Sequence, residues 1–222
     1  MAKRRRTQQI QRRTTRASEE ALNRPLGAGR RFDPRLLIVG GVLVVGVIIV
    51  AVALVAFSGP NPNAGIAQAD RGGGHVPPGT TCRASDEPCG PDPYSSIPAT
   101  SGPHWDPSGI ANWGVYTTPQ NETQLIHNLE HGGIVVWYQP GQIDEAALTQ
   151  LTDWATSQLR SARFKVIVSP WSGPDFGHPI AATAWNFLLY QDALDVGQLQ
   201  GFMDARYGRS PEPNGGPGQP AV

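Results

Sequence analysis

Two histidines four residues apart are the strongest candidates for chemistry in this 222-residue chain. His127 and His131 fall in a segment with helical signals, and residues i and i+4 of a helix project from one face. Two imidazoles on one face are a frequent half-site for Zn²⁺, Cu²⁺ or Ni²⁺. We expect His104 as a third ligand and His75 as a candidate fourth. In the alternative interpretation His131 only interacts with the last carbonyls of the helix.

The same segment contains a pattern known from zinc peptidases. The string His127-Asn-Leu-Glu130-His131 matches H-x-x-E-H, in which two histidines bind zinc and the glutamate acts as general base. Those enzymes also need a downstream carboxylate ligand and a much larger chain. A zinc-dependent hydrolase is therefore an alternative, with Glu130 as its catalytic residue; otherwise Glu130 orients an imidazole or is a surface charge.

Six tryptophans suggest a function of another class. Trp105 and Trp113 lie in the same predicted loop as His104, and Trp171 begins a second turn-rich loop that contains His178. Such loops can form a recognition surface for a peptide or a glycan, although they more often cover a small core. A protein- or glycan-interaction module is thus the first alternative, and we expect His178 to be a loop residue, not a ligand.

The chain has two cysteines, Cys82 and Cys89. Both follow the apolar run Leu36–Phe57 and lie in a polar loop, and an oxidising exterior favours a disulfide between them. A pair of metal-binding thiolates is the competing interpretation, but thiolates usually lie closer together in zinc motifs.

The elements that must position these residues follow from local signals. Asn121 is an expected N-cap, so a helix is predicted from Glu122 to His131, and Gly132-Gly133 ends it. The β-branched and aromatic run Ile134–Tyr138 predicts a buried strand. Asp144 should cap a second helix with apolar residues at helical spacing. The remaining predicted elements are strands at Gly114–Tyr116, Phe164–Ser169 and Ile180–Tyr190 and a helix from Val196 to Tyr207. This order predicts an α+β fold, a small mixed sheet with helices packed on one side.

Charge is divided sharply along the chain although the total is zero. The net charge is +8 before Leu36 and −8 after Phe57. The 22 residues from Leu36 to Phe57 contain no charge and no proline, and they are long enough to cross a hydrocarbon core of about 30 Å. Arg30, Arg31 and Arg35 adjoin the N-terminal end of this run. The positive-inside bias therefore predicts a single-pass cell-membrane protein with a cytoplasmic N-terminus and an extracytoplasmic C-terminal domain.

Two other interpretations of the N-terminal part are weaker. A cleaved signal peptide is suggested by Ala67-Gln68-Ala69, but the apolar run and the segment before it are longer than usual for such a peptide. Nucleic-acid binding is suggested by the basic run Lys3–Arg6, which has no aromatic residue near it. We expect a lipid bilayer and no nucleic acid as partner.

Composition divides the chain into five segments. We predict a basic cytoplasmic tail at residues 1–35, a transmembrane helix at 36–57 and a flexible linker at 58–74. An extracytoplasmic α+β domain should occupy residues 75–207, and the Gly- and Pro-rich residues 208–222 should form a disordered tail.

Two separated motifs carry a family resemblance. Thr100-Ser-Gly-Pro-His104 and Leu129-Glu-His-Gly-Gly133, the second leading into a Val-Val-Trp-Tyr strand, resemble the TSGPH and LEHGG signatures of a family of uncharacterised bacterial domains. The similarity runs from about residue 75 to residue 211. It implies a domain held outside the membrane by one N-terminal helix, with a histidine-bearing site. The residues carried over are His75, His104, His127, Glu130 and His131.

These observations together favour a membrane-anchored domain of unknown function that binds copper or zinc through a histidine cluster. Met203 is the one methionine after the apolar run, which disfavours a thioether-rich Cu(I) carrier. We expect a binding protein rather than an enzyme.

Overall fold

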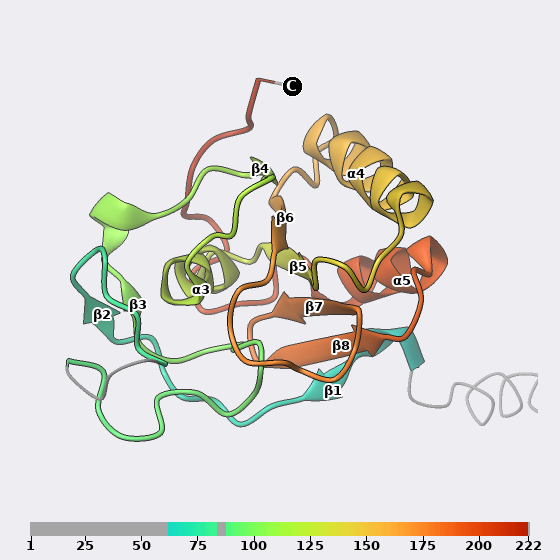
Figure 1. Cartoon of the computed structure of the whole chain (residues 1–222). Helices are drawn as coiled ribbons and strands as arrows, with labels where there is room; N and C mark the ends of the chain where they lie inside the picture. The colour runs from blue at the N-terminus through green and yellow to red at the C-terminus, as the bar shows by residue number, and fades with distance from the viewer. Residues whose placement is uncertain (1–61, 84–87, 222) are drawn as a thin grey trace, which may run out of the picture. The chain divides into compact units, whose positions relative to one another are not determined.

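The computed structural model describes residues 62–83 and 88–221. This part of the chain contains a six-stranded mixed sheet, a separate two-stranded pair and three α-helices (Figure 1). The predicted cytoplasmic tail and the predicted span Leu36–Phe57 lie outside the described residues. Within residues 62–83 and 88–221, no helix has the length and apolar character needed to cross a membrane.

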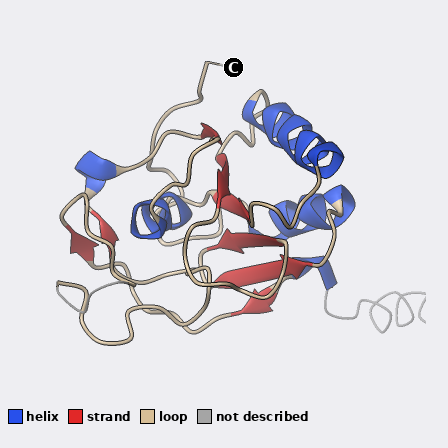
Figure 2. Ribbon diagram, viewed as in Figure 1, coloured by secondary structure: helices blue, strands red, loops and turns tan. Residues whose placement is uncertain are grey.

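The large sheet combines parallel and antiparallel pairs (Figure 2). Its order is β1-β8-β7-β5-β6-β4, in which β5, β6 and β4 are mutually parallel and the other neighbours are antiparallel. The strands are β1 (Ile66–Ala67), β4 (Gly114–Val115), β5 (Ile134–Tyr138), β6 (Val166–Pro170), β7 (Ile180–Ala184) and β8 (Phe187–Gln191). The mixed α+β fold predicted from the sequence is confirmed.

Helices cover both faces of this sheet. Helix α3 (Glu122–Glu130) lies on one side, and α4 (Glu145–Leu159) and α5 (Val196–Arg206) lie on the other (Figure 1). Val135 and Trp137 of β5 belong to the core that includes α3, whereas the intervening residues of β5 belong to the core that includes α4 and α5. The prediction of helices on one side is therefore wrong. The continuous apolar run of β5 is what a strand covered on both faces requires.

The predicted single strand Ile180–Tyr190 is a β-hairpin. Strands β7 and β8 are joined at Trp185 and Asn186, and Asn186 has a positive φ of 61°. A two-residue hairpin loop needs such a conformation, which asparagine tolerates better than most residues. The pattern of apolar residues gives no sign of the turn, because apolar residues continue on both sides of it.

Residues 62–74, expected to belong to a flexible linker, are already part of the fold. Strand β1 pairs with β8, with Ile66 opposite Leu188. The Arg206 guanidinium donates from Nε to the carbonyl of Ala64 at 2.7 Å. The folded unit thus begins before residue 75. The sequence gives no sign of this, because main-chain pairing needs no apolar pattern.

Residues 208–221, expected to form a disordered tail, run back across the domain. We call them the C-terminal strap. The Gly208 N–H donates to the Gly132 carbonyl at 2.9 Å, and the Trp113 indole donates to the Pro217 carbonyl at 2.9 Å. The Lys165 ammonium donates to the carbonyls of Pro213 and Gly215. Hydrogen bonds to main-chain carbonyls hold this segment, and its composition gives no sign of them.

Candidate metal centre

Helix α3 and the C-cap residue that follows it, His131, carry three of the candidate ligands, and the helix is buried over most of its length. The Asn121 side chain caps it by accepting from the Thr123 N–H at 2.9 Å, as predicted, and Gly132 follows its last turn with a positive φ of 78°. Seven of its nine residues are buried. His127, Glu130 and His131 share one face through spacings of three and four residues, so a polar face is turned into the protein.

A parallel strand pair brings in the other two histidines. Strands β2 (His75–Val76) and β3 (His104–Trp105) pair in a register that places His75 directly opposite His104. The two ring centroids are 5.0 Å apart, and the His127 ring lies 4.9 Å from that of His104 and 5.4 Å from that of His75.

Four of the five predicted residues converge on one place, and the fifth, His131, lies beside them. One ligand atom from each of His75, His104, His127 and Glu130 lies within 4.8 Å of the others, a grouping that could hold a metal ion. Glu130 Oε2 is 3.0 Å from His104 Nε2 and 3.9 Å from His75 Nε2. His131 joins the cluster through its Nε2, which is 3.0 Å from His127 Nε2.

Main-chain carbonyls determine which nitrogen of each buried imidazole faces the cluster. His104 Nδ1 donates to the Gly102 carbonyl at 2.9 Å, and His127 Nδ1 donates to the Trp105 carbonyl at 2.6 Å. A carbonyl oxygen only accepts, so Nδ1 carries the proton in both rings. In the neutral form each Nε2 therefore presents a lone pair to the cluster.

His131 follows the same rule through the C-terminal strap. Its Nδ1 donates to the Glu212 carbonyl at 3.0 Å. The carbonyl of His131 itself accepts from the Lys165 ammonium at 2.9 Å, which ties the end of α3 to the strap. His104 and His127 thus belong to the four-residue grouping, and His131 Nε2 faces His127 Nε2 beside it. In each of the three rings the opposite nitrogen donates a hydrogen bond to a main-chain carbonyl.

This arrangement sets hydrogen-bond acceptors against each other at two points. His104 Nε2 faces a carboxylate oxygen of Glu130, and His127 Nε2 faces His131 Nε2, both at 3.0 Å. Two lone pairs repel at this distance unless a proton or another cation lies between them. A positive charge placed between these acceptor atoms would therefore stabilise the cluster.

Protonation of the rings could supply that charge, but burial disfavours the protonated form. It lowers the pKa of His104 to about 4, and it also lowers the pKa of His127. The pKa of Glu130 is raised by burial, which disfavours its charged form. The two histidines are thus held as neutral imidazoles, the form that binds metal ions.

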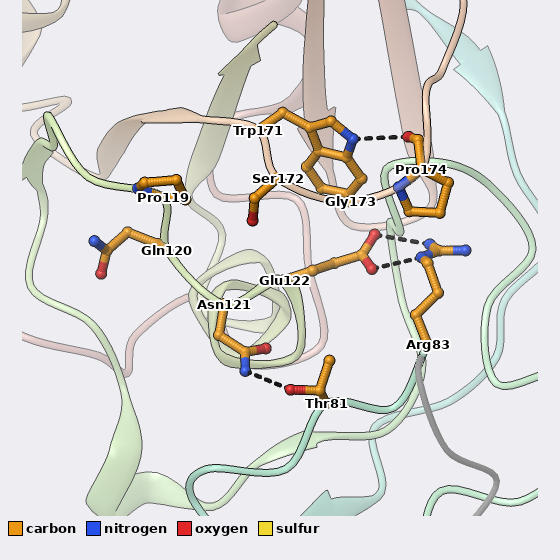
Figure 3. Close-up of a pocket in the computed structure, with 10 residues that line it drawn as sticks. All are labelled: Thr81, Arg83, Pro119, Gln120, Asn121, Glu122, Trp171, Ser172, Gly173 and Pro174. Carbon is orange, nitrogen blue, oxygen red and sulfur yellow. Dashed lines mark hydrogen bonds and ion pairs between the residues drawn. The ribbon is translucent and has the colours of Figure 1, made fainter. Parts of the chain in front are cut away.

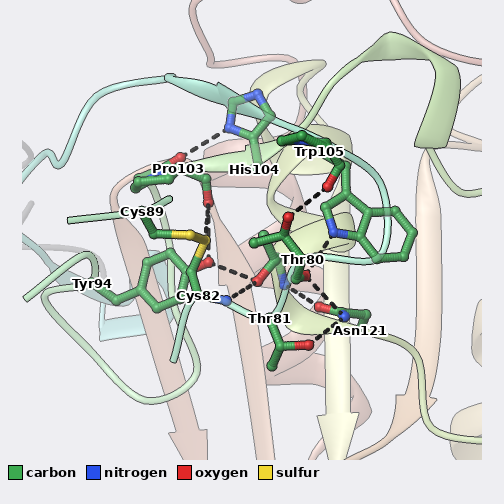
Figure 4. The surroundings of a disulfide bond; sticks show 12 residues. Thr80, Thr81, Cys82, Cys89, Tyr94, Pro103, His104, Trp105 and Asn121 are labelled. Carbon is green, nitrogen blue, oxygen red and sulfur yellow. Dashed lines mark hydrogen bonds between the residues drawn. A yellow bond between two sulfur atoms is a disulfide. The ribbon is translucent and has the colours of Figure 1, made fainter. Parts of the chain in front are cut away.

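The predicted disulfide is present and supports β3. Cys82 and Cys89 are bonded (Figure 4). The Cys82 N–H donates to Thr123 Oγ1 in the first turn of α3 at 3.0 Å. The Tyr94 hydroxyl lies 3.0 Å from that same Oγ1 and 3.0 Å from the Pro103 carbonyl. The disulfide loop and Tyr94 therefore hold the residue before His104 against α3.

The tryptophans do not form an exposed surface. Trp105 is half-buried and donates from its indole to the Thr80 carbonyl at 2.8 Å, and the other five are buried. Trp171 and Trp137 contact each other edge to face inside the core, with ring centroids 5.0 Å apart. The feature on which the interaction-module alternative depends is missing. His178 lies apart from the cluster and interacts with Asp192.

A pocket of about 490 Å³ (Figure 3) lies at the N-terminal end of α3, away from the histidine cluster at its C-terminal end. Its charged residues are already paired, because Arg83 donates to both carboxylate oxygens of Glu122 at 2.7 and 2.8 Å. Glu122 also accepts from the Ala99 N–H at 2.6 Å. These contacts give the pair a structural role in tying the disulfide loop to the start of α3.

The hydrolase alternative lacks its third ligand among the described residues. Glu130 is itself part of the histidine cluster and so does not stand apart as a general base. The Glu212 carboxylate lies 3.9 Å from His131 Nδ1, the nitrogen that faces away from the cluster, and its side chain is 63% exposed. Within the described residues the H-x-x-E-H string therefore has the helical spacing of the zinc-peptidase pattern without a separate downstream carboxylate beside it.

This is an α+β domain with a mixed sheet covered on both faces. It holds a histidine–carboxylate cluster between α3 and a parallel strand pair. The chain belongs to DUF3105, a family of proteins of unknown function whose model matches residues 87–219. The match includes four residues of the cluster, whereas His75 lies before it. No curated protein and no solved structure matches the chain.

Proposed function

We propose that this domain binds one transition-metal ion, copper or zinc, through His104, His127 and His131, with Glu130 and His75 completing the site. The observation that carries this proposal is the pattern of Nδ1–H···O=C hydrogen bonds, which leaves the Nε2 lone pairs of His104, His127 and His131 available to a metal ion. Metal-ligating histidines characteristically donate their other ring N–H to a carbonyl or carboxylate, because this sets the tautomer and the ring orientation.

A cation resolves both unfavourable contacts at once. It replaces the protons that would otherwise have to lie between His104 and Glu130 and between His127 and His131. The Glu130 carboxylate supplies a compensating negative charge in a site whose other candidate ligands are imidazoles. Burial that disfavours protonation of His104 and His127 leaves their lone pairs available to the ion.

The ligand set favours Zn(II) or Cu(II) over Cu(I). Both cysteines are in the disulfide, so no thiolate is offered by the described residues. Met203 lies in the core that includes α4 and α5, on the other side of the sheet from α3. Imidazole nitrogen with one carboxylate suits zinc and oxidised copper.

We further propose that the domain works outside the membrane, attached by Leu36–Phe57. The disulfide supports an oxidising compartment. The charge difference across the apolar run supports the orientation. In this setting the domain acts as a metal-binding protein and not as an enzyme.

The test is elemental analysis of the full-length chain, purified in detergent without a His-tag and dialysed after exposure to zinc or copper. The parent should retain about one equivalent, and a His127→Ala/His131→Ala variant should lose it. A His178→Ala variant is the matched control, because that histidine lies outside the cluster and should leave retention unchanged. A folded parent that retains neither ion would refute the proposal.

A further inference from the structure

The residues of the cluster differ sharply in their exposure to solvent. The side chain of His104 is 0% exposed, that of Glu130 8% and that of His131 10%, whereas that of His75 is 46% exposed. His75 is therefore the member of the cluster that an approaching ion or ligand can reach first.

His75 belongs to a short, largely exposed segment that hydrogen bonds of its main chain hold to its neighbours, including one from the Arg71 N–H to Ser101 Oγ at 3.0 Å. We call residues 70–76 the His75 segment. Residues 70–75 are exposed, and Val76 is the segment's one buried side chain. Main-chain carbonyls of the segment accept from the N–H groups of Gly102, His104 and Asp106 at 2.8, 2.9 and 2.9 Å. One buried apolar side chain and a ladder of only three main-chain hydrogen bonds are the features of a segment that opens at low free-energy cost.

The His75 segment also covers the Glu130 carboxylate. A Cβ atom added at Gly73 would collide with Glu130 Oε1, whereas one added at Gly74 would meet nothing within 4 Å. The main chain at Gly73 thus passes directly over the carboxylate. The segment carries one candidate ligand and closes off another, while the remaining three histidines are fixed by α3, β3 and the C-terminal strap.

We infer that the His75 segment is the path by which the ion enters and leaves, with His75 as the exchanging ligand. Separation of the segment from β3 removes His75 from the ion and uncovers Glu130, and the three buried imidazoles keep their orientation. The step is a ligand exchange in which the metal keeps its oxidation state, and the incoming donor takes the position that His75 leaves. The inference rests on the proposed metal binding and adds the route of exchange.

The experiment measures zinc release from the zinc-loaded full-length chain to an excess of a coloured chelator. Gly73→Ala should speed release about tenfold, the scale seen when residues supporting a metal site are disturbed. His75→Ala should also release faster, since it lacks the exchanging ligand. Gly74→Ala is the matched control, because it stiffens the same segment without meeting Glu130, and it should release zinc at the parental rate.

The outcomes separate this inference from the proposed function. If the parent binds one zinc, and the parent and the three variants all release it at one rate, the route is wrong and metal binding stands. If the folded parent binds no zinc, both are wrong. Near-UV circular dichroism establishes folding, and His75→Ala, an exposed substitution, keeps the test decisive if Gly73→Ala fails to fold.

Discussion

The Nδ1–H of His131 donates to the main-chain carbonyl of Glu212, 81 residues further along the chain, at 3.0 Å. A helix that local sequence signals predict thus has one of its histidines oriented by the far C-terminal part of the chain. Gly215 lies against the same imidazole, where a Cβ atom would collide with the ring. The C-terminal strap is therefore part of the candidate site.

Replacing Gly215 with alanine should displace the strap from His131 and weaken zinc binding by about tenfold, because the imidazole loses its orienting hydrogen bond. The dissociation constant is measured by competition with a chelator. Gly218→Ala is the matched control, since a Cβ there meets nothing within 4 Å. Equal affinities in both variants would show that the strap does not position the ligand.

Replacing Glu130 with glutamine should have opposite effects on the metal-free and zinc-loaded protein. The new amide group can donate to His104 Nε2, so the repulsive contact at 3.0 Å becomes a hydrogen bond worth about 1 kcal/mol. The loss of the carboxylate should weaken zinc binding at the same time. Urea unfolding with and without zinc measures both effects. A metal-free Glu130→Gln protein less stable than the parent would contradict the assignment of acceptors.

Removing the disulfide should destabilise the domain without removing the candidate ligands. The Cys82→Ser/Cys89→Ser variant should lose about 2–3 kcal/mol of unfolding free energy, the chain-entropy value for so short a loop. The measurement is urea unfolding, and the parent in reducing agent should match the variant. An unchanged midpoint would mean that the contacts of Thr123 and Tyr94 alone hold the loop against α3.

The metal-free protein should lose stability as the pH falls from about 6.5 towards 4. The pKa of His104 is about 4 in the folded state and 6.5 in its ordinary state, so between these values the unfolded chain binds a proton that the folded domain does not. The contribution of His104 to the free energy of unfolding is complete above pH 6.5 and declines as the pH approaches 4. It amounts to roughly 3 kcal/mol at most.

Glu130 works in the opposite direction, because burial raises its pKa. The test is therefore a comparison of the parent with His104→Asn by urea unfolding in EDTA at pH 4, 5, 6 and 7. The parent should lose stability more steeply than the variant below pH 6.5. Parallel curves would show that burial of His104 does not control this pH dependence.

Local sequence signals are enough to predict part of this site. The Asn121 cap, the glycine stop and the helical spacing predict α3 and place His127 and His131 on one face, because capping and periodicity act within a few residues. The run of β5 and the disulfide were predicted in the same way. Such local preferences have little dependence on the rest of the fold.

The assembly of the site depends on contacts between segments that are distant in the sequence. His75 meets His104 through main-chain pairing between distant segments, and Glu212 orients His131 with a carbonyl that every residue type possesses. Helices on both faces of the sheet and a strap built from a Gly- and Pro-rich tail were likewise not predicted. Main-chain hydrogen bonds carry no side-chain signature, so the sequence gives no sign of which distant segments they will join.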